Sequence, residues 1–238
     1  MEGFMMHLDG KEVKREELDL IPMPEESDTY KPVSHYHLAN KLLTVSQVIL
    51  RDYAIVGEHY GLARKGNQMF AYFKFQKEAD EMALSLAFRN SYDRSMSIGL
   101  AVGASVFVCD NLALQGEIVV MKKHTKNVWL ALENICIQTL YKSQECFTKI
   151  VKDSMIMKSR ELNDAEAFKI MGLLYGRDIL SPRQLTVVKD QWLTPAHEEF
   201  QPRNLWSLYN ACTEALKTSP PLSVMEKHVQ LHSTIIDV

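Results

Sequence analysis

The stretch Ser97-Ile-Gly-Leu-Ala-Val-Gly-Ala-Ser-Val-Phe-Val108 decides the fold class of this chain. Large apolar residues or alanine occupy every second position from Ile98 to Val108, which predicts a strand that packs one face on a core. The opposite face carries only small residues as far as Ser105. Two of these are glycines, which predict a bulge or bend, or the close approach of another backbone or a ligand.

Shorter patterns upstream predict further strands. Residues 54–62 form the first, and residues 69–76 alternate in the same way after the turn signal Lys65-Gly66-Asn67, which indicates a β-hairpin. Residues 82–89 alternate between apolar positions and the small or polar Ser85, Ala87 and Arg89. Short turns between consecutive strands favour an antiparallel meander.

Helical patterns surround these strands. Ser34 can cap a helix that reaches residue 49, and the chain is expected to become helical again after Asn111, with one long helix from about 126 to 158. Asn163, Ser181 and Asn204 begin shorter helices. We therefore predict an α+β fold, in which an antiparallel sheet of three to five strands packs against a long helix and a helical C-terminal part follows.

Charge and pattern divide the chain into an acidic N-terminal arm (1–33), an α+β core (34–160), a helical C-terminal subdomain (161–220) and a tail (221–238). The arm has nine acidic and four basic residues, which leaves 21 acidic and 23 basic residues for the remainder. A nearly neutral body neither demands nor forbids nucleic acid, because binding depends on a local patch.

Several protein classes are disfavoured. No apolar run approaches the roughly 20 residues that span a bilayer, and no export signal is visible, so we expect no membrane partner and a cytoplasmic location in a host cell. The four cysteines are scattered and suit a reducing compartment. Common cofactor motifs are absent, so no cofactor is predicted. His35 and His37 lack a third ligand with metal-site spacing, so no metal is predicted.

Two basic segments are the candidate binding residues. The loop with Arg89, Asn90, Ser91 and Arg94 can bind phosphate through charge-assisted hydrogen bonds, or it can be a turn with an internal Arg–Asp pair. The segment before the long helix is either a phosphate site or a solvated loop, and it contains Lys122, Lys123, His124 and Lys126.

Three further groups of residues can contribute to binding. Arg64 and Lys65 at the hairpin turn extend the same surface if the fold brings them near. Phe70, Tyr72 and Phe107 are either stacking platforms for bases or packing residues. Asp93, Asp110 and Glu117 are the acids that an Mg²⁺ ion would need if the chain were a nucleic-acid enzyme.

Four motifs in a fixed order give the chain a resemblance to the phage/plasmid-like family of domains of unknown function, DUF932. They are Phe88–Ser95 with the following strand and Val108–Leu112; Lys123-His124-Thr125; Tyr30, Pro32 and His35; and Leu205, Trp206, Tyr209 and Asn210. The chain departs from the family at Leu112, where the family usually has glycine. The resemblance implies a virus or plasmid origin. The order of elements is also similar to that of single-strand annealing recombination proteins.

We derive three functional hypotheses. The first is a mobile-element protein that forms a homo-oligomer, has no enzymatic activity, and binds or anneals single-stranded DNA in recombination. The second is a phage protein that inhibits a host defence component, with the acidic arm as the contact. The third is a metal-dependent nucleic-acid enzyme.

Overall fold

The computed structural model describes residues 11–77, 82–106, 112–125, 127–220 and 223–238, and it has the predicted α+β architecture. One antiparallel sheet has its strands in chain order: β1 (Lys11–Val13), β2 (Ala54–Ala63), β3 (Gln68–Gln76), β4 (Met82–Ser91), β5 (Ile98–Val106) and β6 (Leu112–Lys122). The α-helices are α1 (His35–Ile49), α2 (Val128–Ser159), α3 (Asp164–Gly176), α4 (Pro182–Leu193), α5 (Leu205–Leu216) and α6 (Val224–Ile236). Short 3-10 helices are η1 (Arg15–Leu20), η2 (Arg64–Gly66) and η3 (Glu198–Phe200).

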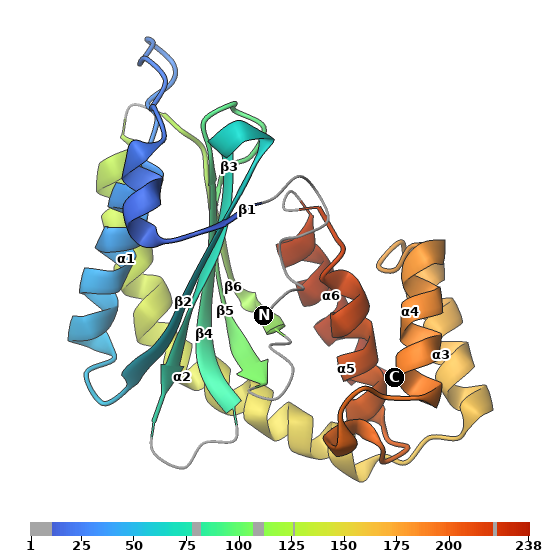
Figure 1. The fold of residues 1–238 in the computed structure, drawn as a ribbon. Helices are drawn as coiled ribbons and strands as arrows, with labels where there is room; N and C mark the ends of the chain where they lie inside the picture. Colours follow the sequence, from blue (N-terminus) through green and yellow to red (C-terminus); the bar gives the residue numbers. More distant parts are fainter. Residues whose placement is uncertain (1–10, 78–81, 107–111, 126, 221–222) are drawn as a thin grey trace.

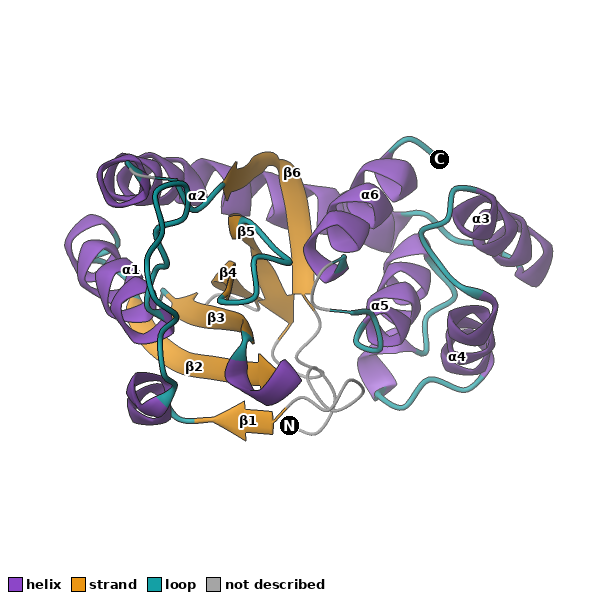
Figure 2. Cartoon of the chain, turned by 90° about the horizontal axis from the view of Figure 1, so that it is seen from above, coloured by secondary structure: helices purple, strands orange, loops and turns teal. Residues whose placement is uncertain are grey.

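The main core lies between one face of the sheet and helices α1 and α2, and it continues among helices α3, α4 and α5 (Figures 1 and 2). Ile98, Leu100 and Val102 of β5 are buried there, as their alternation predicts. Phe73 is fully buried with its ring 4.9 Å from that of Phe88, in an edge-on arrangement. Burying a ring of this size stabilises the fold by about 1.5–3 kcal/mol.

Helix α6 lies on the opposite face of the sheet (Figure 1). Its residues Val224 and Met225 form a second, smaller apolar cluster with Phe70, Tyr72 and Ala101. Residues after 220 were expected only as a tail, and they supply this helix instead. Phe70 and Tyr72 are buried in the cluster. Of the two alternatives for these rings, the structure therefore supports packing and not the stacking of bases.

Strand β6 was not predicted from the sequence. The chain was expected to become helical after Asn111. Ala101 pairs with Val119, and Gly103 pairs with Leu114. Val102 of β5 therefore faces four residues of β6, 115–118. This bulge interrupts the period-2 alternation on which strand prediction depends. Gly103 lies beside the bulge, in agreement with the bulge interpretation of the β5 glycines.

The N-terminal arm is folded onto the body over its described part. Its residues 11–13 form β1, which pairs with the edge of β2, and Leu18 of η1 is buried in the main core. The sheet therefore has five long strands and one short edge strand. The described part of the arm is therefore wrapped on the body.

The predicted helix starts are confirmed. The Ser34 hydroxyl accepts a hydrogen bond from the His37 amide at 3.2 Å. Asn163 and Glu166 form a reciprocal capping box with distances of 3.0 and 2.8 Å, and Ser181 begins α4 in the same way. None of the described helices is long and apolar enough to span a membrane.

Replacing Phe73 by alanine is expected to lower the free energy of unfolding by about 3–5 kcal/mol, because the cavity it leaves adds to the lost burial. Urea unfolding followed by circular dichroism measures this. Val48→Ala is the control, since Val48 is 73% exposed and its truncation should change stability by less than about 0.5 kcal/mol. Equal effects of the two variants would contradict the assigned core.

Candidate nucleic-acid interface

Three connecting segments lie at one end of the sheet, at the top in Figure 1. They are residues 64–67 between β2 and β3, residues 92–97 between β4 and β5, and residues 123–125 after β6. The strand register fixes this arrangement, because Gln68 pairs with Ser91 and Ile98 pairs with Lys122. Basic segments that are far apart in the sequence thus reach the same end of the sheet.

His35 at the start of α1 ties two of these segments together. Its Nε2 lies 3.0 Å from the Gly66 carbonyl, and its Nδ1 lies 2.9 Å from the Asn90 side-chain amide. That amide also donates to the Val33 carbonyl at 2.6 Å, which fixes its orientation and makes His35 Nδ1 an acceptor. The proton of the neutral imidazole is therefore on Nε2, from which it is donated to Gly66.

The His35 ring also stacks on Tyr92, with centroids 3.9 Å apart and planes at 11°. The backbone amide of His35 donates to the Tyr92 hydroxyl at 2.9 Å. Burial lowers the pKa of His35 from 6.5 to about 4, and the hydrogen bond to Gly66 opposes this only in part. His35 is therefore neutral at physiological pH and has a structural role, whereas His37 is exposed and points elsewhere.

Tyr30 of the arm links the β4–β5 loop to the end of β6. Its hydroxyl donates to the carbonyls of Ser91 and Tyr92 at 3.4 and 3.2 Å. Its ring lies 5.4 Å from the ring of His124, and the amide of the next residue, Lys31, donates to the His124 carbonyl at 3.2 Å. The guanidinium of Arg94 lies over the same ring, 4.4 Å from its centroid. Arg94 and His124 are therefore brought together around one aromatic side chain.

Five of the predicted cations lie on this end of the sheet: Arg64, Lys65, Arg94, Lys122 and Lys123. Four of them are exposed and Lys122 is partly exposed. None forms an ion pair with another described residue, whereas Lys31 is paired with Glu26. We call these five side chains the cationic row. Unpaired, solvated cations at one edge are suited to bind phosphates.

Strained backbone accompanies three members of the row. Arg64, Lys65 and Arg94 have φ angles of 49°, 57° and 61°, and among the described non-glycine residues only Asp178 shares this left-handed conformation. Such a residue costs roughly 1–2 kcal/mol relative to a right-handed one. The β2–β3 turn and the β4–β5 loop thus hold their cations in conformations that the residues do not favour by themselves.

Asp93 is the acid beside the row. Burial would raise the pKa of Asp93, but hydrogen bonds from Ser95 and Gln68 and the charge of Arg64 outweigh it and hold the pKa below its usual range. The Ser95 amide donates to the Asp93 carboxylate at 3.0 Å. Asp93 thus stabilises the loop by accepting hydrogen bonds. An ion pair between Asp93 and an arginine of the same loop, which was the alternative, is not observed.

The remaining loop candidates point away from the row. Arg89 is 4% exposed, and its two terminal nitrogens donate to the Glu226 carboxylate of α6 at 2.9 and 2.8 Å, on the opposite face of the sheet. Ser91 is buried and exchanges hydrogen bonds with Met96, and Asn90 holds His35. The expectation that Arg89 and Arg94 share one surface is therefore corrected, because Arg89 of β4 is held by Glu226 on the α6 face, whereas Arg94 lies in the following loop over the Tyr30 ring.

Some candidates lie outside the described residues or side chains. These are Lys126, Phe107, Asp110 and the side chain of Glu117. Within the part of the chain that the structure describes, no three or more His, Cys, Asp or Glu side chains gather in a way that could hold a metal.

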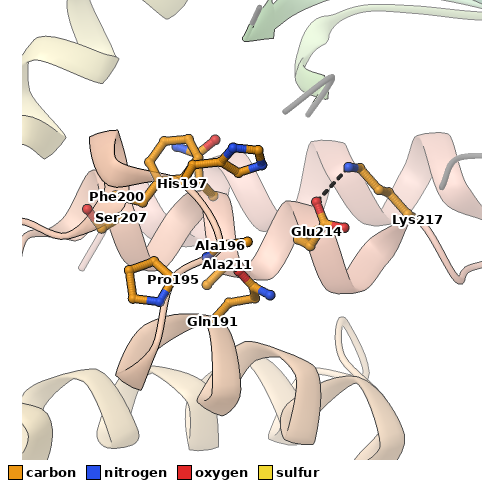
Figure 3. Close-up of a pocket in the computed structure, with 10 residues that line it drawn as sticks. Gln191, Pro195, Ala196, His197, Phe200, Ser207, Ala211, Glu214 and Lys217 are labelled. Carbon is orange, nitrogen blue, oxygen red and sulfur yellow. Dashed lines mark hydrogen bonds and ion pairs between the residues drawn. The ribbon is translucent and has the colours of Figure 1, made fainter. Parts of the chain in front are cut away.

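A separate cavity of about 110 Å³ lies between the end of α4, η3 and α5 (Figure 3). Its lining includes the buried Ser207 hydroxyl, which has no hydrogen-bond partner in the described structure. The His197 ring contacts Phe200 edge-on at 6.0 Å, and Lys217 donates to Glu214 at 2.5 Å. Ser207 and His197, both described, form no hydrogen bond to each other, so the cavity shows no paired nucleophile and base.

Acid is expected to destabilise the fold through His35. Its folded pKa lies below the unfolded value, so the unfolded chain binds the proton first and stability is lost as the pH falls from 6.5 to about 4. The loss is about 3 kcal/mol. Urea midpoints across this range, and the imidazole NMR titration of His35 against that of exposed His37, test it. A His35 ring that titrates near 6.5 would contradict the buried, neutral assignment.

Replacing Lys65 by glycine is expected to leave stability unchanged or to raise it by up to about 1 kcal/mol, because glycine adopts φ 57° without strain. The matched control is Lys189→Gly in α4, an exposed helical position, where the same change should cost about 1 kcal/mol. Thermal unfolding of the two variants measures the difference. A destabilised Lys65→Gly would mean that the Lys65 side chain stabilises the fold.

Comparison with known families agrees with the motif order. The family model described as "Domain of unknown function (DUF932)" matches residues 25–232. The matched range contains Tyr30, His35, the β4–β5 loop and His124. No curated protein and no solved structure matches the chain. Because the match extends over far more than half of its length, the chain belongs to the DUF932 family.

Proposed function

We propose that this protein binds the phosphate backbone of single-stranded DNA along the cationic row. The observation that carries the proposal is that five cations from three separate segments lie at one end of the sheet without an ion pair among the described residues. In the proposal, the protein belongs to a phage or plasmid, acts in the host cytoplasm as an assembly of several copies, and holds single strands for annealing in recombination.

The dimensions of the row suit a nucleic-acid strand. Neighbouring strands lie about 4.8 Å apart, so the distance from the β2–β3 turn to the end of β6 is about 15–20 Å. A row of this length can contact several successive phosphates of an extended strand. Asp93 lies next to the row, and its oxygens already accept hydrogen bonds from Ser95 of its own loop and from Gln68 of β3.

Backbone binding of this kind depends on salt. Replacing both Lys122 and Lys123 by alanine is expected to weaken the binding of a 20-nucleotide single strand. It should also reduce the slope of log K against log salt concentration by up to about 1.4, since each contacted phosphate contributes about 0.7. Fluorescence anisotropy at several salt concentrations measures both effects.

The control removes two exposed lysines from another surface. Lys169→Ala with Lys189→Ala, on α3 and α4, lowers the net charge equally and should leave the slope unchanged. An equal loss in both double variants would mean that binding is diffuse. No affinity for single strands even at low salt would reject the proposal. In that case, capture of a host protein that persists after nuclease treatment would favour the anti-defence alternative.

A further inference from the structure

We infer that the Tyr30 ring is a stacking platform for an unpaired nucleobase, which takes the place that the Arg94 guanidinium occupies on it. This inference rests on the proposed function and adds a base contact to the phosphate contacts. An aromatic platform also gives the protein a means to select single strands, because the bases of a duplex already stack on one another.

The geometry separates a fixed platform from a movable cover. The Tyr30 hydroxyl donates to two backbone carbonyls at 3.4 and 3.2 Å, and its ring contacts His124, so the ring is held from two sides. Arg94 is exposed, has no ion-pair partner among the described residues and lies over the ring face at 4.4 Å. Tyr30 is 5% exposed in this arrangement, so its use as a platform requires Arg94 to leave.

Magnitudes favour the exchange. An exposed cation–π contact is worth about a 2- to 5-fold effect on an equilibrium constant, whereas stacking one base on an aromatic side chain is worth about 5- to 140-fold. The displaced guanidinium does not lose its interactions, because a phosphate of the same strand can replace the ring as its partner. Lys122 and Lys123 immediately precede His124, whose ring lies beside Tyr30, so phosphates next to the stacked base can meet further cations.

Oligonucleotides that differ only in their bases test the inference. The wild-type protein is titrated with a 20-mer of deoxythymidine and with a 20-mer of the same length and charge whose central six sites are abasic. The inference expects at least about 5-fold tighter binding of the intact strand, with equal salt slopes. Tyr30→Leu should remove most of the difference between the two strands, while Tyr30→Phe, which keeps the ring, should retain it.

Arg94→Ala separates the two roles further. It removes the guanidinium from the ring face and removes one cation, so the salt slope should fall by about 0.7 while the preference for intact strands remains. Equal affinity of wild-type protein for intact and abasic strands, with normal salt dependence, would overturn the platform and leave backbone binding in place. Absence of binding to both strands at low salt would overturn the proposed function and the platform together.

Discussion

The His35 imidazole is the contact on which the cationic end of the sheet depends. It is hydrogen-bonded to the β2–β3 turn through Gly66 and to β4 through Asn90, and it stacks on Tyr92 of the following loop. Two connections that would otherwise move separately are therefore held by one buried ring. His35 is also the first residue of α1, so its contacts fix the position of the loops relative to the helix that covers the core.

This junction explains how strained loop residues persist. Left-handed conformations at Arg64, Lys65 and Arg94 are kept only where the surroundings determine the backbone more strongly than the residue itself does. Gly66 supplies the next left-handed position, at φ 88°, and a Cβ there would lie 3.0 Å from the Ile21 side chain. The arm, the turn and the helix start thus restrict one another, and they fix the backbone of the turn that carries Arg64 and Lys65.

Local patterns made most of the fold predictable. Period-2 alternation located β3 to β5, the turn signal Lys65-Gly66-Asn67 supported β2, and side-chain caps located the starts of α1, α3 and α4, because these signals arise within a few residues. β6 was missed since its bulge breaks the alternation. α6 was missed although Ser223 and Glu226 have the spacing of a capping box, and in the structure Glu226 accepts hydrogen bonds from Arg89 instead of capping the helix.

The residue types of the candidate site could be predicted from the sequence, but not which of these residues share one surface. Alternation along residues 82–89 already placed Arg89 on the face opposite the apolar positions, but its partner there, Glu226, lies 137 positions away and could not be predicted from local patterns. Tyr30 was named by motif order alone. Its link to Arg94 and His124 joins three distant segments, and no spacing within one segment predicts such a contact.

The bulge in β6 has a consequence for how copies of this protein can meet. A sheet grows from molecule to molecule when an edge offers a regular ladder of unpaired amides and carbonyls. Over the described residues, one edge strand has three residues, and the other contains a bulge of residues 115–118. Both edges are poor templates for such a ladder, which favours side-chain surfaces over a shared sheet in any assembly of copies.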